Sequence, residues 1–196
     1  IDTILAPAAN PLLAFPNIYH SYSKPGVYNV TLTAKSYCGE TETTNQVIVN
    51  PLPNISFTNN DSICAGDTVS FESFVFASAN TLRVDTCTFF PDTIHINVPA
   101  GDSNFTYTWD FNDPASGISN SDSIPNPDHQ FSECKVYNVS LHVRDGNGCD
   151  TTYYKEVIVY DLPHPVFTTE SICVPDITNF LDASYFSTTA PPDACY

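Results

Sequence analysis

The chain has 196 residues, with 16 Pro against 7 Gly, 13 Phe, 11 Tyr and no Met, so we expect a processed or excised piece that lacks its initiator. Its 6 basic and 22 acidic residues give a net charge of −16, which makes nucleic acid and anionic membrane surfaces poor partners because phosphate binding needs a positive field. No apolar run approaches the roughly 18 residues of a membrane span, no signal peptide is recognisable, and seven Cys without metal-type spacing indicate an oxidising compartment. We therefore expect a soluble, extracellular protein.

Short alternating segments broken by Pro, Asn, Asp and Ser recur along the chain, and long amphipathic helical patterns are absent, which is typical of an all-β protein. The expected strands of the middle of the chain cover residues 54–58, 67–75, 105–111, 127–131, 136–144 and 150–160. Residues 105–111 place four aromatic side chains on one face, among them Trp109, the only tryptophan. The same alternation puts Tyr137 and Leu141 on one face of their strand. Trp109, Tyr137 and Leu141 are the predicted core residues.

The chain repeats itself with a period of 109 or 110 residues. The matched blocks are residues 20–22 with 129–131, 28–32 with 137–141, 47–53 with 157–163, and 62–64 with 171–173. A period near 110 residues is the size of one β-sandwich domain. The sequence therefore predicts a tandem array.

This period predicts one complete unit at residues 51–160, preceded by the C-terminal part of a unit at 1–50 and followed by the N-terminal part of another at 161–196. The joints between them are short and carry Pro, so they are expected to be semi-rigid and to suit a rod. Residues 76–104 form an insertion that is longer than a connection needs and contains a strand-like segment at 93–98. A unit-specific function is expected in this insertion.

Three motifs of the middle unit occur in the order known from one family: WDFND at 109–113, NPDHQF at 126–131 and VYNVSLHV at 136–143. Together they resemble the polycystic kidney disease (PKD) domain, whose pattern is a WDFGDG strand and turn, an NPxHxY segment and GxYxVxLxV. The resemblance implies an immunoglobulin-like β-sandwich. Asn112 and Pro114 replace the two glycines of the family's turn, so the turn geometry departs from the pattern.

The segments at 62–67 and 147–149, with the Pro-Leu-Pro joints, are similar to those of tandem surface proteins of Bacteroidota. In that group such arrays form giant adhesins and gliding-related filaments exported by the type nine secretion system. The resemblance therefore implies a cell-surface location.

The immunoglobulin-like topology implied by the resemblance favours two disulfides, Cys64 with Cys134 and Cys87 with Cys149. Each pair would lie at one pole of the sandwich, and a disulfide needs Cα atoms within about 7 Å. Four cysteines also permit other connectivities, and an inter-domain bridge stays open. The other three cysteines would pair within the missing parts of their own units: Cys38, Cys173 and Cys195.

No phosphate loop, GxSxG elbow or HExxH motif occurs and the five His are scattered, so no catalytic residue is predicted and we do not expect an enzyme. Calcium is the one possible cofactor, because hard cations take oxygen ligands. The candidate ligands are Asp110, Asn112 and Asp113, with Asp102 and Asp128 expected nearby. The alternative is that Asp113 caps a turn and Asp110 faces solvent.

Glycosylation is a further hypothesis. The Bacteroidota O-glycosylation pattern is Asp, then Ser or Thr, then an apolar residue or Thr, and it occurs at Thr3, Ser62, Thr68, Thr93, Ser123 and Thr151. Sequons for N-glycosylation, which matter only in a eukaryotic source, begin at Asn29, Asn54, Asn60, Asn104 and Asn138.

These features favour a non-catalytic structural repeat in the stalk or filament of a large cell-surface adhesin, with neighbouring repeats of the same chain as its partners. Two alternatives stay open. One is an accessory carbohydrate- or protein-binding module of a secreted multidomain enzyme, which would present Phe89, Phe90 or Tyr107 to a polysaccharide or a protein surface. The other is a protomer that self-assembles end to end into a filament.

Overall fold

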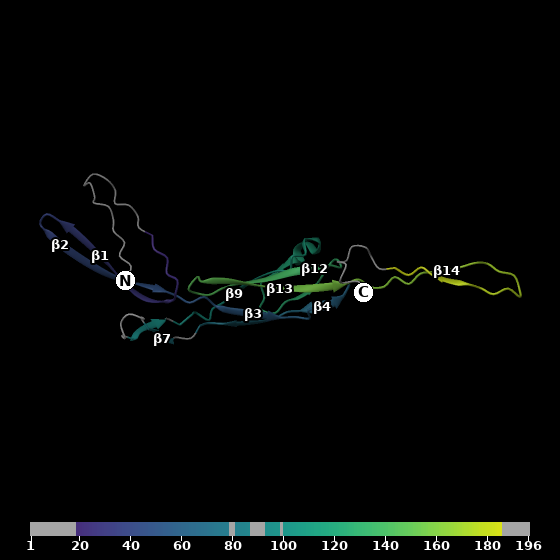
Figure 1. Cartoon of the computed structure of the whole chain (residues 1–196), viewed down its shortest axis with the longest axis horizontal. Coiled ribbons are helices and arrows are strands. Elements are labelled where there is room, and N and C mark those ends of the chain that lie inside the picture. Colours follow the sequence, from purple (N-terminus) through teal and green to yellow (C-terminus); the bar gives the residue numbers. More distant parts are fainter. Residues whose placement is uncertain (1–18, 79–80, 87–92, 99, 186–196) are drawn as a thin grey trace. The chain divides into compact units, whose positions relative to one another are not determined.

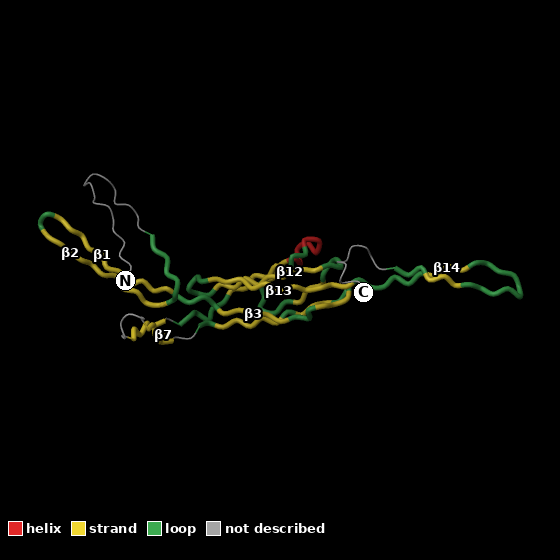
Figure 2. Tube along the Cα trace, in the orientation of Figure 1, coloured by secondary structure: helices red, strands yellow, loops and turns green. Residues whose placement is uncertain are grey.

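The computed structural model describes residues 19–78, 81–86, 93–98 and 100–185, and these residues are mostly β-strand (Figures 1 and 2). They include one 3₁₀ helix, η1 (Pro114–Asn120). Among the described residues no helix has the length and apolarity to span a membrane. The chain falls into two compact units, which we call the first unit (Ile1–Val49 with Leu82–Pro99) and the second unit (Asn50–Thr81 with Ala100–Tyr196).

The second unit is consistent with a β-sandwich. Its larger sheet has the order β10 (Ser121–Asp122), β9 (Thr106–Asp110), β12 (Val136–Arg144), β13 (Asp150–Tyr160), β4 (Ser62–Cys64). The other layer pairs β3 (Asn54–Thr58) with β6 (Glu72–Phe76) and β5 (Thr68–Ser70) with β11 (Asp128–Gln130). β3 contacts both β12 and β13 across the core (Figure 1). The observed strands agree with those expected from the sequence, except that the single strand expected at 67–75 is divided into β5 and β6, which pair with different strands. The two short strands β4 and β10 were not expected.

The core of the second unit lies between these two layers. Its fully buried apolar side chains are Phe57, Val69, Phe71, Trp109, Phe111, Tyr137, Val139, Leu141, Val143, Val157 and Val159. The Trp109 ring lies 4.9 Å from that of Phe57 and 5.3 Å from that of Phe71, measured between ring centroids. The register sets Leu141 of β12 opposite Trp109 of β9, so the aromatic strand and the aliphatic strand face the same interior.

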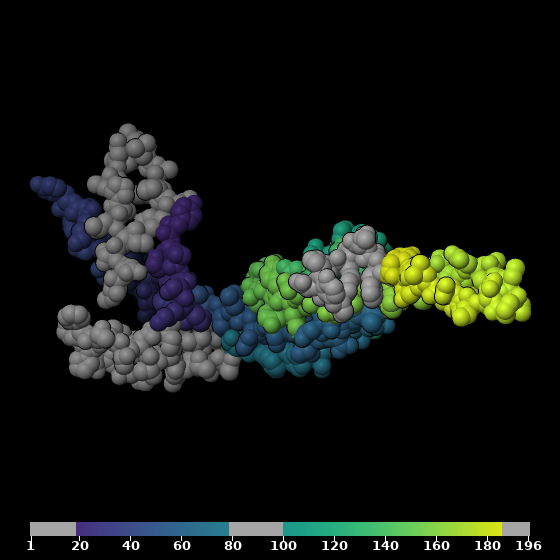
Figure 3. Space-filling view, turned by 45° about the vertical axis from the view of Figure 1, so that its right-hand side comes forward, coloured from purple at the N-terminus to yellow at the C-terminus, as the bar shows by residue number. Residues whose placement is uncertain are grey.

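The first unit contains two pairs of strands. β1 (Gly26–Ser36) and β2 (Gly39–Val49) form an antiparallel hairpin, and β7 (Thr81–Thr86) pairs with β8 (Thr93–Val98) in the predicted insertion. β8 lies against β1. The tip of the β1–β2 hairpin is exposed on both faces (dark blue in Figure 3).

The chain continues from the sandwich of the second unit into β14 (Phe167–Thr169) and β15 (Phe180–Asp182), which pair with each other. An isolated bridge between His164 and Tyr185 follows at their base. This hairpin lies in the segment predicted to begin a further unit, but it groups with the second unit by contacts.

The predicted pairing of Cys64 with Cys134 is wrong. Cys64 lies beside Tyr160 on one edge of β13, and Lys135, the neighbour of Cys134, accepts a hydrogen bond from Val159 N–H on the other edge. The two cysteines therefore share one end of the sheet, but β13 runs between them. Two strand spacings place them roughly 10 Å apart, beyond the about 7 Å that a disulfide spans. The Cys64 thiol is free, so the predicted Cys64–Cys134 disulfide is not formed.

The second predicted disulfide involves Cys149, which carries a free thiol in the β12–β13 turn. Its expected partner, Cys87, lies outside the described residues, as does Cys195. Cys38 and Cys173 also carry free thiols.

Candidate functional site

The turn after β9 carries the residues that sequence analysis singled out. Asn112 has φ of 55°, the left-handed conformation that glycine adopts most easily and that Asn tolerates better than most residues. Its N–H donates to Asp110 Oδ1 at 2.9 Å, and the Asn120 side-chain amide donates to the same oxygen at 3.2 Å. Pro114 then begins η1, where its missing N–H is not needed. Asn112 thus fills the place of the family's glycine.

Asp113, the next residue in this turn, belongs to a buried polar cluster with His129 and Ser132. Its Oδ2 accepts a hydrogen bond from Ser132 N–H at 2.9 Å and lies 3.2 Å from His129 Nε2, while Ser132 Oγ donates to Oδ1. Burial alone would raise the pKa of Asp113, but the hydrogen bonds from Ser132 and His129 outweigh it and lower that pKa. The cluster therefore stabilises a charged carboxylate inside the sandwich.

His129 is held by aromatic contacts as well as by Asp113. Its ring stacks on Phe111 with centroids 4.1 Å apart and planes 7° apart, and it meets the edge of Phe131. Burial lowers the pKa of His129, although the hydrogen bond and charge of Asp113 act in the opposite direction. The imidazole is therefore neutral near pH 7.

This cluster differs from a nucleophilic Ser-His-Asp arrangement. In such a site the serine oxygen donates to the histidine, which activates it. Here Ser132 Oγ donates to Asp113, and His129 binds the same carboxylate. The arrangement fastens the β9 turn, β11 and the segment after β11 to one another, which is a structural role.

The five candidate calcium ligands lie in three different places. Asp110 and Asn112 are exposed in the β9 turn, where the Asp113 oxygens are already engaged in hydrogen bonds. Asp128 lies on β11. Asp102 lies against Gly146 in the β12–β13 turn, so close that a side chain at that glycine would clash with it. Across the described ranges no group of three or more His, Cys, Asp or Glu is placed to hold a metal ion.

The β12–β13 turn contains Asp145, a residue that sequence analysis missed. Its side chain is buried; Oδ1 accepts from Cys149 N–H at 2.9 Å, while Oδ2 has no hydrogen-bond partner among the described residues. Asp145 directly follows the apolar alternation of β12, but a turn aspartate ordinarily faces solvent, so its burial leaves no mark in the sequence.

The aromatic residues proposed to bind polysaccharide are placed differently from expectation. Phe89 and Phe90 lie outside the described residues. Tyr107 is half-buried and packs against the core, so it does not form an exposed platform. The aromatic side chains that β6 exposes on its outer face are Phe74 and Phe76, the latter 61 % exposed.

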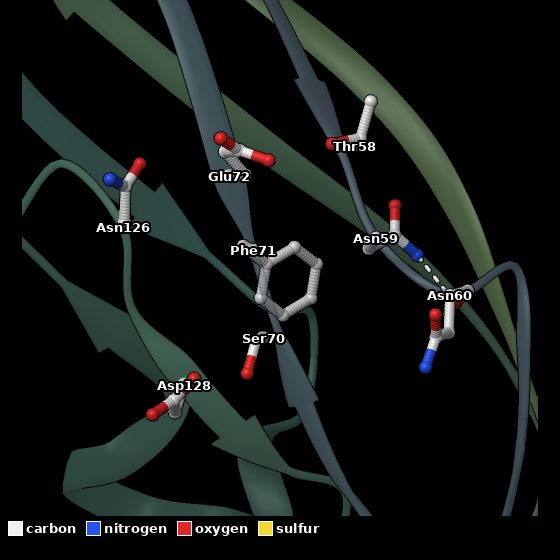
Figure 4. A pocket seen from close by; sticks show the side chains of 8 residues that line it. All are labelled: Thr58, Asn59, Asn60, Ser70, Phe71, Glu72, Asn126 and Asp128. Carbon is white, nitrogen blue, oxygen red and sulfur yellow. Dashed lines mark hydrogen bonds between the residues drawn. The ribbon is translucent and has the colours of Figure 1, made fainter.

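A shallow cavity of about 470 Å³ lies between the end of β3, the start of β6 and the segment before β11 (Figure 4). Its lining is mostly polar: Thr58, Asn59, Asn60, Ser70, Phe71, Glu72, Asn126 and Asp128. Asn126 Oδ1 accepts hydrogen bonds from the N–H and hydroxyl of Ser73, which fixes one wall. Asn59 donates to Asn60 O, and its own buried Oδ1 has no partner among the described residues.

The predicted glycosylation positions are distributed over several elements. Ser62 on β4, Thr68 on β5 and Ser123 after β10 are exposed, and Thr151 on β13 is half-buried. Thr93 lies on β8, and Thr3 lies outside the described residues.

Several side-chain contacts occur twice, about 109 residues apart. The Tyr28 hydroxyl donates to Lys24 O at 2.8 Å, and the Tyr137 hydroxyl donates to Glu133 O at 2.9 Å. Three ring pairs also recur with similar distances between ring centroids. The pairs His20–Tyr22 and His129–Phe131 both measure 4.6 Å. Tyr22–Tyr28 at 4.4 Å corresponds to Phe131–Tyr137 at 4.2 Å, and Phe57–Phe71 and Phe167–Phe180 both measure 5.9 Å.

A family model described as the PKD domain matches residues 79–159. This match runs from before β7 to Val159 in β13 and supports a PKD, immunoglobulin-like assignment for that part of the chain. No curated protein matches the chain.

Proposed function

Because residues 79–159 match the PKD domain, a domain typical of extracellular structural and binding modules, we propose that the chain is a non-catalytic structural repeat of a large cell-surface protein. Its partners are neighbouring repeats of the same chain. The Pro-bearing joints at 50–53 and 160–163 connect these repeats without long flexible linkers.

The observation that carries this proposal is the duplicated side-chain geometry. The tyrosine that donates to the carbonyl four residues before it occurs in β1 and in β12, with its neighbouring aromatic ring in both places. The ring pair of Phe57 on β3 with Phe71, the residue between β5 and β6, recurs as Phe167 on β14 with Phe180 on β15. Since these contacts belong to different thirds of the chain, they support the interpretation that 1–50 and 161–196 are parts of further units.

The sequence features shared with Bacteroidota surface proteins extend the proposal to the stalk or filament of an adhesin, exported by the type nine secretion system. The acidic surface suits this role because a net charge of −16 keeps neighbouring repeats soluble. An antibody raised against the chain tests the proposal. We expect it to label intact cells and to detect a polypeptide several times longer than 196 residues. Detection inside the cell, or on a chain with a catalytic domain beside this one, would contradict it.

A binding module is the second candidate, and the outer face of β6 favours it. Phe74 and Phe76 are exposed there, and aromatic faces stack on sugar rings. The polar cavity nearby offers amides and carboxylates for hydroxyl groups. A glycan array, read with the wild type and with the Phe74→Ala and Phe76→Ala variants, tests this candidate. Binding that neither substitution weakens would exclude this surface.

Glycosylation is part of the same proposal, since Ser62, Thr68 and Ser123 are exposed. An intact mass of the natively produced protein measures it directly. We expect an excess over the peptide mass in hexose-sized steps, mapped to Asp-Ser and Asp-Thr peptides. A mass equal to that of the peptide would remove glycosylation from the proposal.

A further inference from the structure

The strand pair β14–β15 (Figure 1) repeats the strand pair β3–β6 of the sandwich. Both pairs are antiparallel and share one register. Three cross-strand pairs correspond: Phe57–Ser73 and Phe167–Asp182, Thr58–Glu72 and Thr168–Leu181, Asn54–Phe76 and His164–Tyr185. β14–β15 therefore has the backbone geometry of the layer that β3 and β6 form in the sandwich.

The turn after β14 repeats the turn after β4. Asp67 N–H donates to Cys64 O at 3.1 Å, and Asp176 N–H donates to Cys173 O at 2.7 Å. In the sandwich, β4 pairs in parallel with one edge of β13. The counterpart of β4, residues 171–173, pairs with no strand in the part of the chain that the structure describes. This segment is thus available to pair with the edge of another strand.

The apolar side chains of this hairpin are exposed where their counterparts are buried. Phe57 and Phe71 are both 2 % exposed in the sandwich. Their counterparts Phe167 and Phe180 are 66 % and 70 % exposed, and Ile172, which takes the place of a buried isoleucine of β4, is 42 % exposed. We call Phe167, Ile172 and Phe180 the β14–β15 face. It resembles a core layer that lacks its covering sheet.

The β1–β2 hairpin repeats the strands that β3 covers in the sandwich. β3 contacts both β12 and β13. Tyr28 lies opposite Val47 in β1–β2, as Tyr137 lies opposite Val157 in β12–β13. β1–β2 therefore has the register of the layer on which a β3–β6 pair packs.

The apolar face of β1–β2 is exposed as well. Val139 and Leu141 are fully buried in β12, whereas their counterparts Val30 and Leu32 in β1 are 45 % and 62 % exposed. Val47 lies on the same side, and we call Val30, Leu32 and Val47 the β1–β2 face. Among the described residues β2 pairs with β1 alone, whereas β13 also pairs with β4. β2 thus has the free edge that residues 171–173 require.

We propose that the β14–β15 face of one copy of the chain docks on the β1–β2 face of a second copy, as β3–β6 covers β12–β13 in the sandwich. Residues 171–173 would pair along the free edge of β2. This contact joins two different surfaces, so each pair of copies keeps one free face at either end and association continues beyond a dimer. The inference goes beyond the proposed function, because the partner is a second chain.

The docked hairpins would form a smaller core than that of the sandwich. The repeat places no counterpart of β9, the strand of Trp109, in residues 1–50 or 161–196. The interface therefore lacks the tryptophan that packs against Phe57 and Phe71 in the sandwich. For this reason the association is reversible and depends on concentration.

Sedimentation velocity of the 196-residue chain tests the docking. At an ionic strength of about 0.15 M, which screens repulsion between chains of charge −16, we expect the average sedimentation coefficient to rise from about 1 µM to about 1 mM protein. Phe180→Asp should abolish this rise, because docking would bury the new charge. Leu181→Asp is the matched control. Leu181 is 68 % exposed on the opposite face of the same strand, so this variant should associate like the wild type.

A second pair of variants tests the other face. Leu32→Asp should abolish association, and Thr31→Asp, on the opposite face of β1, should retain it. Leu32→Asp keeps an intact β14–β15 face, and Phe180→Asp keeps an intact β1–β2 face. An equimolar mixture of these two variants should therefore form heterodimers and nothing larger. Trp109 fluorescence verifies that the sandwich stays folded in every variant, since Trp109 is fully buried there.

A wild type that stays monomeric over the whole concentration range would overturn the docking, as would equal effects of Phe180→Asp and Leu181→Asp. Association that persists in Leu32→Asp or Phe180→Asp alone, or a mixture of the two that stays monomeric, would overturn it too. Each of these results would leave the cell-surface proposal intact, because that proposal depends on the antibody experiment.

Discussion

At the scale of single residues, Tyr137 is buried and makes two hydrogen bonds with the backbone of Glu133. Its hydroxyl donates to Glu133 O at 2.9 Å and accepts from Glu133 N–H at 3.0 Å. Tyr137→Phe removes both bonds and should lower the free energy of unfolding by about 1–3 kcal/mol. Urea unfolding followed by Trp109 fluorescence measures the change. Tyr154→Phe is the control, since Tyr154 is 61 % exposed on β13 and its substitution should cost almost nothing.

His129 makes stability depend on pH. Because burial lowers its pKa below the ordinary 6.5, the unfolded chain binds more protons than the folded chain when the pH falls below that value. The contribution of His129 to the free energy of unfolding is therefore fully present above about pH 6.5 and is lost as the pH falls below that value. The lowered pKa of Asp113 acts in the same direction below pH 3.8. We expect unfolding at a lower urea concentration at about pH 5 than at about pH 7.5.

Two variants test whether His129 is the source of this pH dependence. His129→Gln can still donate to Asp113 but cannot titrate, so it should flatten the change between the two pH values. His142→Gln removes an exposed imidazole, 3.2 Å from Asp150, and should retain the wild-type change. A pH dependence unaltered in His129→Gln would show that the buried histidine is not its source.

The burial of individual residues could be predicted from the sequence only in part. The alternation in β9 and β12 suffices to place Trp109, Tyr137 and Leu141 in the core, because a strand has a period of two. Asp113 is different. Its burial depends on His129 and Ser132, which are 16 and 19 residues away, and a polar residue after a strand reads as an exposed turn.

At the scale of elements, the ring cluster formed by β3, β9 and Phe71, the residue between β5 and β6, should dominate stability. Phe71 is fully buried and its ring lies 5.3 Å from both Trp109 and Phe111. Phe71→Ala should therefore lower the free energy of unfolding by about 3–5 kcal/mol, through lost burial and the cavity that remains. Phe76→Ala, on the exposed face of β6, is the matched control and should cost less than about 1 kcal/mol. Similar losses in both variants would contradict the layer assignment.

The topology that the family resemblance implies predicts at which end of the sandwich each loop lies. It does not predict which strand lies between two loops at the same end. Cys64 and Cys134 illustrate this limit. The three-residue strand β4 pairs in parallel with β13, a contact too short to leave a periodic signal in the sequence. That pairing places β13 between the two cysteines. The strands of the sandwich were therefore predictable, and the lateral order that decides the disulfides was not.

At the scale of the whole molecule, the excess of 22 acidic over 6 basic residues makes every salt effect a combination of screening and specific binding. Calcium chloride and sodium chloride at equal ionic strength separate the two. We expect the same melting temperature in both, because the Asp113 oxygens are already hydrogen-bonded and Asp110, Asp102 and Asp128 lie apart.

A calcium site would be unmistakable in this experiment. A site with a dissociation constant of about 10 µM, in about 1 mM calcium, adds about 2.7 kcal/mol to the free energy of unfolding, which is roughly 5–10 °C in melting temperature. A rise of that size, reversed by a chelator, would contradict our expectation. Asp110→Asn and Asp145→Asn would then locate the ion. Loss of the rise in Asp145→Asn alone would place it at the β12–β13 turn, where Asp145 Oδ2 has no hydrogen-bond partner among the described residues.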